Sequence, residues 1–282
     1  MNQKLHVLQN SINQIYVEKF KDYQGGLNLS VPCIPRISEA YFENRVVVVG
    51  QETNTWYNET DDDLYKVFLK KTNDIENICL NSKYDVFVEE CVQNYPGKFW
   101  NFNRRLYDEI FHRPMVEGKY LSHVWLNLFS VEAIAYKKSK IGSPTKNNAL
   151  AQEIIKMQRD LLYEVLNLLK PKLILFLTGH GLDTYVVNNS LCTKNYEFVP
   201  LDKNGLLTER NLAEIKIKDQ DHPLSQIKIF RSYHPSYFMG HIGKFKSLQT
   251  RINQKIGNKS NSAYYTETFI NAIKDYYENR DK

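Results

Sequence analysis

The chain has 282 residues, and its 37 Lys and Arg against 32 Asp and Glu give a formal net charge of +5. This length excludes a short peptide module and is enough for one domain whose core needs no disulfide or metal to hold it. The mild positive charge fits an ordinary soluble protein as well as a phosphate-binding face, so composition alone does not identify a partner.

The cysteines and the N-terminal segment bear on the compartment. Cys33, Cys79, Cys91 and Cys192 show no C-x-x-C spacing, so we expect free thiols in a reducing compartment, without a metal site or cofactor. The N-terminal segment lacks the long apolar core of a secretion signal, and no apolar run approaches the length of a membrane span. We therefore expect a cytoplasmic protein with no membrane-spanning segment.

The chain opens with a predicted amphipathic helix, because Leu5, Leu8, Ile12 and Ile15 recur at helical spacing. A Gly- and Pro-rich loop over 25–36 follows. Beyond it, short and nearly continuous apolar runs are typical of strands that are buried on both faces of a parallel sheet. These runs are RVVVVG at 45–50, HVWLNLF at 123–129, KLILFLTG at 172–179 and IKIFRSY at 227–233.

Helical patterns separate the four strands and close the chain. Apolar positions at three- and four-residue intervals predict helices over 62–72, 99–112, 148–170, 243–255 and 262–278. The stretch 190–225 fits either a hairpin or a loop insertion. Alternating strands and helices predict an α/β fold of three layers, αβα, around a central, mainly parallel four-stranded sheet. We expect residues 1–282 to form a single domain.

Polar or Gly-rich residues follow all four predicted strands. In sheets of this kind the ligand binds beyond the carboxyl ends of the strands, so these residues predict a site. They are Gly50-Gln51-Glu52-Thr53-Asn54 after the first strand, Asn127 near the end of the second, Thr178-Gly179-His180-Gly181 after the third and His234-Pro235-Ser236 after the fourth.

These segments resemble the motifs of the uracil-DNA glycosylase superfamily. In the family's order they read GQETN, HVWLNLF, PKLILFLTG and YHPSYF, and the resemblance runs from about residue 30 to about residue 245. It implies a monomeric enzyme without a cofactor that flips a base out of DNA and hydrolyses its N-glycosidic bond, leaving an abasic site.

The resemblance assigns catalytic roles to Glu52 and His234. Glu52 stands where the family has an Asp or Asn that positions the attacking water, and it is longer by a methylene than that residue in many members. His234 matches the His that hydrogen-bonds the departing base. Ser236 would bind a DNA phosphate. The structural alternatives are a surface Glu at a helix start, a His satisfied within its loop and a simple turn Ser.

Further residues concern the base. Asn127 and Gln51 offer donors and acceptors to a pyrimidine edge. Asn54 stands where uracil enzymes of the family carry a Tyr that blocks the C5 methyl of thymine, so the resemblance implies a pocket open to modified pyrimidines. Trp56 and Tyr57 would form an aromatic platform under the base, or else belong to the core.

Other residues are candidates for contact with the DNA strand. Gly179 and His180 fit a second phosphate-binding loop, or a plain turn between strand and helix. Lys138 belongs to a basic loop over 136–146 that either touches DNA or is solvated. Phe238 aligns with the apolar wedge that fills the hole left by a flipped base, and the alternative is that it packs back onto the domain.

Three other functions stay open. One is a member of the same fold that binds nucleic acid without cleaving it, and another is a hydrolase of free nucleosides or nucleotides. A Rossmann-like enzyme fits poorly, because GQETN carries one Gly rather than a Gly-rich phosphate loop. The sequence does not select the base, the strand preference, or repair over defence against modified foreign DNA such as phage DNA.

Overall fold

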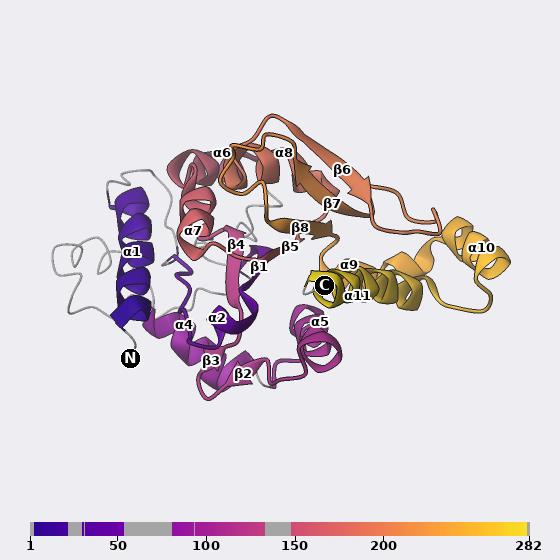
Figure 1. Ribbon diagram of the computed structural model, residues 1–282, viewed down its shortest axis with the longest axis horizontal. Coiled ribbons are helices and arrows are strands. Elements are labelled where there is room, and N and C mark those ends of the chain that lie inside the picture. The colour runs from indigo at the N-terminus through magenta and orange to yellow at the C-terminus, as the bar shows by residue number, and fades with distance from the viewer. Residues whose placement is uncertain are drawn as a thin grey trace.

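A mainly parallel sheet of six strands forms the centre of the computed structural model (Figure 1). The structure describes residues 3–21, 30, 32–53, 81–92, 94–132 and 148–280. The strands of this sheet are β1 (Val46–Glu52), β4 (Val124–Phe129), β5 (Leu173–Leu177), β6 (Tyr196–Pro200), β7 (Leu212–Ile217) and β8 (Lys228–Ser232). A separate two-stranded hairpin pairs β2 (Val116–Glu117) with β3 (Tyr120–Leu121).

The strand order is β4-β1-β5-β8-β7-β6. The strands β4, β1, β5 and β8 are parallel to one another, and they are the four that the apolar runs predict. The prediction of a four-stranded sheet is wrong, because β6 and β7 form an antiparallel hairpin that extends the sheet from β8. The hairpin pairs the backbone groups that β8 would otherwise leave open at a sheet edge.

Helices cover both faces of the sheet. Val47 and Val49 of β1 pack in one apolar cluster with residues of α1, α6 and α7, whereas Val46 and Val48 pack in another with residues of α5, α9, α10 and α11. This alternation follows from the two-residue period of a strand. In Figure 1, α1 and α7 lie on one side of the strands, and α5, α9 and α11 lie on the other.

The helices of the described residues vary from one turn to five. The α-helices are α1 (Gln3–Phe20), α2 (Tyr41–Asn44), α4 (Ser82–Val86), α5 (Lys98–Leu106), α6 (Asn148–Met157), α7 (Leu161–Leu169), α8 (Asp183–Tyr185), α9 (Pro235–Phe238), α10 (Lys246–Lys255) and α11 (Asn261–Arg280). Short π-helical turns are η3 (Phe87–Val92), η4 (Tyr107–Phe111) and η7 (Val186–Ser190), and 3₁₀ turns are η6 (His180–Leu182) and η8 (Ile242–Lys244).

Most predicted helices are confirmed, but the one over 148–170 is broken into α6 and α7. Between them Asp160 adopts a left-handed backbone with φ of 61°, a conformation that Asp tolerates better than most residues. The buried side chain of Gln158 donates to the Leu128 carbonyl oxygen and accepts from Ser130 Oγ, so this junction is tied to the end of β4. The predicted helix over 62–72 lies outside the described residues.

Of the two cysteine side chains in the described residues, Cys33 is buried and Cys192 is partly buried. Within the described ranges, no helix is both long enough and apolar enough to cross a membrane.

Candidate functional site

The carboxyl ends of β1 and β4 bring Gly50 and Asn127 together. The two residues are direct partners in the parallel register, and a β-carbon built on Gly50 would lie 2.5 Å from Asn127 Oδ1. Real β-carbons do not approach another atom this closely, so only glycine lets the Asn127 amide occupy its place. The glycine that ends the first predicted strand thus lies directly beside the Asn near the end of the second.

The Asn127 amide has unused hydrogen-bonding capacity. The residue is 2% exposed, yet its contact in the described part of the chain is a long one, from Nδ2 to Cys33 Sγ at 3.9 Å. Its Oδ1 accepts no hydrogen bond from a described residue. A primary amide offers two donors and two lone pairs, and burying them unpaired is costly. This amide is therefore suited to a polar ligand at the strand ends.

The ends of β1, β5 and β8 are joined by hydrogen bonds. Gln51 Nε2 donates to the Thr178 carbonyl oxygen at 2.7 Å, and the Gly179 N–H donates to the Ser232 carbonyl oxygen at 2.8 Å. In the sheet, β4 lies on one side of β1 and β5, which follows β4 in the chain, lies on the other side. The strand order therefore reverses beside β1. Ligands of doubly wound sheets bind at such a reversal. The Gln51 side chain lies at this reversal, where its amide is hydrogen-bonded to the Thr178 backbone.

His234 is held in one tautomer by the turn that follows β8. Its Nδ1 accepts a hydrogen bond from the Ser236 N–H at 3.2 Å, as the N-cap of α9. Burial lowers the pKa of His234 from 6.5 to about 4, so the imidazole is neutral at pH 7. With Nδ1 accepting, the ring proton resides on Nε2. His234 can therefore offer an N–H donor to a ligand.

Phe99 is a site residue that the sequence analysis missed. Its ring stacks on His234 with centroids 5.7 Å apart and an interplanar angle of 19°. Its Cε2 lies 3.5 Å from the position of a β-carbon on Gly50. Phe99 is half-buried in the first turn of α5, and it joins the end of β1 to the end of β8. Its signal in the sequence was the aromatic run KFWNF at 98–102, far from every strand-end motif.

Comparison of the sequence with models of protein families finds no match, and comparison with curated proteins finds no relative. Any assignment of this chain to a family therefore rests on the residues at the strand ends.

Glu52 is the last residue of β1, half-buried and opposite Phe129 of β4. It lies at the same sheet edge as Gln51 and Asn127, as expected. The remaining predicted residues near the base, Asn54, Trp56 and Tyr57, lie outside the described residues, and so does Lys138.

The loop after β5 lies beside the segment after β8. Gly179 has a positive φ of 78°, which favours glycine, and a β-carbon on it would meet the Tyr233 ring at 3.3 Å. The His180 and Tyr233 rings stand edge-to-face with centroids 5.5 Å apart. Ser236 is exposed at the start of α9, where a phosphate has access to it. Gly179, His180 and Ser236 thus stand at the predicted edge of the sheet.

Phe238 does not face outward. It is 0% exposed, packs edge-to-face on Phe102 at 5.3 Å and stacks on Tyr265 at 4.9 Å. The expectation that it forms a wedge in DNA is wrong for this conformation, because the one-turn helix α9 directs the ring into the core beneath α5 and α11. Tyr237 and Met239, its neighbours, are only partly buried.

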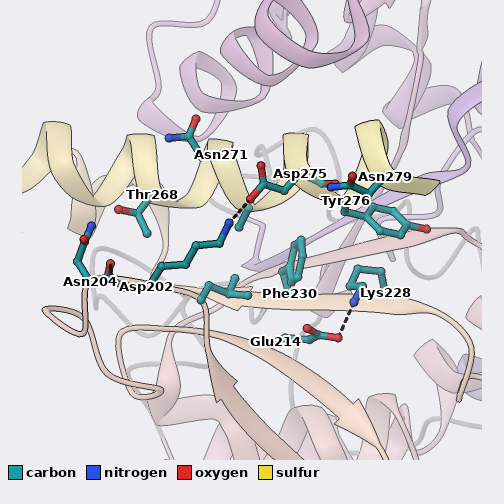
Figure 2. A pocket seen from close by; sticks show the side chains of 13 residues that line it. Asp202, Asn204, Glu214, Lys228, Phe230, Thr268, Asn271, Asp275, Tyr276 and Asn279 are labelled. Atoms are coloured by element: carbon teal, nitrogen blue, oxygen red, sulfur yellow. Dashed lines mark hydrogen bonds and ion pairs between the residues drawn. The ribbon is translucent and has the colours of Figure 1, made fainter. Parts of the chain in front are cut away.

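A groove of about 730 Å³ between α11, the strands β7 and β8 and the segment 201–204 after β6 is a different feature (Figure 2). None of the predicted site residues lines it. Four of its charged side chains form ion pairs, Lys228 with Glu214 and Lys203 with Asp275, each at 2.7 Å, and Asp202 accepts a hydrogen bond from the Tyr264 hydroxyl at 2.7 Å. Figure 2 shows Asp275 on α11 above the groove and Lys228 paired with Glu214 below it. Internal pairing of this kind favours a structural role for these side chains over recognition of a charged ligand.

Proposed function

We propose that this chain is a DNA glycosylase of the uracil-DNA glycosylase superfamily. It would hydrolyse the N-glycosidic bond of a flipped-out, modified pyrimidine in DNA and leave an abasic site. The observation that carries the proposal is the Asn127 amide, which is buried at the strand ends beside Gly50 and whose one described contact is the long one from Nδ2 to Cys33 Sγ. A pyrimidine edge presents the matching donors and acceptors.

The neutral imidazole of His234 suits departure of the base. When the glycosidic bond breaks, its electron pair leaves with the base, and negative charge develops on the base carbonyl oxygens. The Nε2–H of His234 would donate to such an oxygen and lower the barrier. Because Ser236 N–H holds Nδ1 as an acceptor, the donor is pre-oriented at no cost during the reaction.

Glu52 is the proposed partner of the attacking water. The sugar becomes an oxocarbenium-like cation as the bond breaks, and a carboxylate at this edge stabilises that charge. It would also orient water, whose oxygen bonds to the sugar C1′ while its proton ends on solvent or on the base. The balanced outcome is a free base and an abasic strand.

Phe99 is the stacking surface that the geometry favours for the base. It lies between Gly50 and His234, so a base bound to Asn127 and His234 would meet its ring. Asn54 in place of the family's Tyr supports a substrate that carries a substituent at C5, because the steric block is removed. Repair and defence against modified foreign DNA both fit such a substrate.

The test is a panel of oligonucleotides that carry uracil, hydroxymethylated pyrimidines and larger C5 adducts, with matched free nucleosides. Alkali cleaves the strand at abasic sites, so cleavage after incubation measures excision. We expect at least one modified pyrimidine to be excised from the oligonucleotide and not from the free nucleoside. Release only from nucleosides would indicate a nucleoside hydrolase, and tight DNA binding without any release would indicate a non-catalytic member of the fold.

A further inference from the structure

A row of aromatic rings leads away from the candidate site, from the loop after β5 to the start of α10. The centroids of His180 and Tyr233 are 5.5 Å apart, and those of Tyr233 and Tyr237 are 4.4 Å apart. Tyr237 in turn lies 6.2 Å from His241 and 6.3 Å from Phe245. His241 is exposed, and Phe245 is 47% exposed, so an aromatic face at this end of the row is open to a partner.

The row runs through a stretch of sequence that has no acidic side chain. No Asp or Glu occurs between Asp221 and Glu267. Within it, Lys244 and Lys246 flank Phe245 in the chain and Arg251 follows in α10; all three are exposed, and none forms an ion pair with a described residue. These cations are therefore available to an anionic partner.

A further cation lies at the other end of the row. Arg210 is exposed and donates through Nη2 to His180 Nε2 at 3.3 Å. The aromatic row is thus flanked by positive charge at both ends. Aromatic rings combined with a positively charged surface are the features that bind single-stranded nucleic acid.

The path begins at the candidate active site. Tyr233 directly precedes His234, and a β-carbon built on Gly179, just after β5, would lie 3.3 Å from the Tyr233 ring. A strand that places one nucleotide at Asn127 and His234 would therefore have its neighbouring nucleotides beside Tyr233 and Tyr237.

We propose that Tyr233, Tyr237 and Phe245, together with Lys244, Lys246 and Arg251, bind single-stranded DNA beside the candidate site. Duplex DNA offers its phosphates but keeps its bases stacked on each other, so it would use the cations and leave the exposed Phe245 ring and the exposed parts of Tyr233 and Tyr237 without partners. An unpaired strand uses both, because every base has a face that stacks on an aromatic ring. The link to excision rests on the proposed function, whereas the binding itself does not require catalysis.

The test uses the full chain carrying Glu52→Gln and a fluorescein-labelled, unmodified oligonucleotide, as a single strand and as a duplex. Fluorescence anisotropy measures both affinities. We expect tighter binding of the single strand, and a loss of about five- to a hundredfold for Phe245→Ala on the single strand with a smaller loss on the duplex. Lys244→Ala with Lys246→Ala should lower the salt dependence of binding to both.

The matched control is Phe42→Ala. Phe42 is 44% exposed in α2, which leads into the amino end of β1, so its loss should leave both affinities unchanged. Equal affinity of wild type and Phe245→Ala for the single strand overturns the proposal, as does binding to anionic phospholipid vesicles that DNA does not compete.

The same variants separate this proposal from the proposed function. If the protein excises no base but its single-strand binding depends on Phe245, the binding surface is supported and the glycosylase proposal is rejected. If the protein excises a base from duplex DNA but Phe245→Ala does not change single-strand binding, the glycosylase proposal is supported and the binding surface is rejected.

Discussion

Gly50 and Asn127 face each other across β1 and β4, with the Asn127 amide oxygen 2.5 Å from where any β-carbon on Gly50 would stand. The position of the amide thus depends on the absence of a side chain on the neighbouring strand. A contact of this kind is a testable element of the site, because one methyl group breaks it.

Gly50→Ala should displace the Asn127 amide and lower base excision on the order of a hundredfold, since small misplacements of a positioning group cost about this much. Single-turnover excision by wild type and variant measures the effect. Gly118→Ala is the control, because Gly118 lies in the turn between β2 and β3, a β-carbon there meets nothing within 4 Å, and the rate should stay unchanged. Equal rates for Gly50→Ala and wild type would remove Asn127 from the proposed base contact.

His234→Asn should keep α9 in place, because Asn also caps helix N-termini, but it withdraws the imidazole donor. We expect DNA binding to persist and excision to fall by about a hundred- to a thousandfold, as for removal of one donor from an oxyanion site. In the wild type, the pKa of about 4 keeps His234 neutral from pH 5 to pH 8. A wild-type rate that titrates near pH 6.5 and loses that titration in His234→Asn would contradict the neutral-donor role.

Phe99→Ala should remove the ring that lies against both Gly50 and His234. Loss of one stacked base typically costs about 1–3 kcal/mol, so we expect excision to weaken by roughly five- to a hundredfold. The effect should appear in the rate measured with saturating enzyme as well as in affinity, because His234 loses its stacking partner. An unchanged rate would leave the platform role to residues other than Phe99.

A pH prediction concerns His123, which precedes β4 and is 0% exposed with both ring nitrogens lacking a partner in the described part of the chain. Burial lowers the pKa of His123 from 6.5 to about 3. At a pH between these two pKa values, His123 is protonated in the unfolded chain and neutral in the native state. The free energy of unfolding therefore falls as the pH decreases below about 6.5.

Urea unfolding at pH 7.5 and pH 5 measures this dependence. His123→Phe, which keeps a ring against Tyr107, should reduce the loss on acidification by about 2 kcal/mol. If the variant loses as much stability as the wild type, then His123 is not the group that resists protonation.

The short apolar runs predicted the four parallel strands because burial on both faces leaves little freedom in residue type. The strand ends followed from them, and so did the edge at which Gln51, Asn127 and His234 lie. The extension of the sheet by β6 and β7 was harder to predict, since β6 is partly exposed and lacks the apolar run that marked the buried strands.

Features that depend on distant contacts were missed. The break between α6 and α7 goes with the hydrogen bonds of Gln158 to the end of β4, which no local pattern encodes. Phe99 joins the site only because α5 packs beside β1 and the turn after β8. Phe238 looked like a surface wedge in the sequence, but Phe102 and Tyr265, both remote along the chain, enclose it.

The most direct test of the glycosylase proposal is the stoichiometry of products from one modified oligonucleotide, for wild type and Glu52→Gln. Mass spectrometry of the reaction measures the free base and the intact strand that carries an abasic site. The account predicts equal amounts of both from the wild type, and a rate lower by about a hundred- to ten-thousandfold in Glu52→Gln at retained DNA binding. Release of a nucleotide instead of a base, or excision by Glu52→Gln at the wild-type rate, would contradict it.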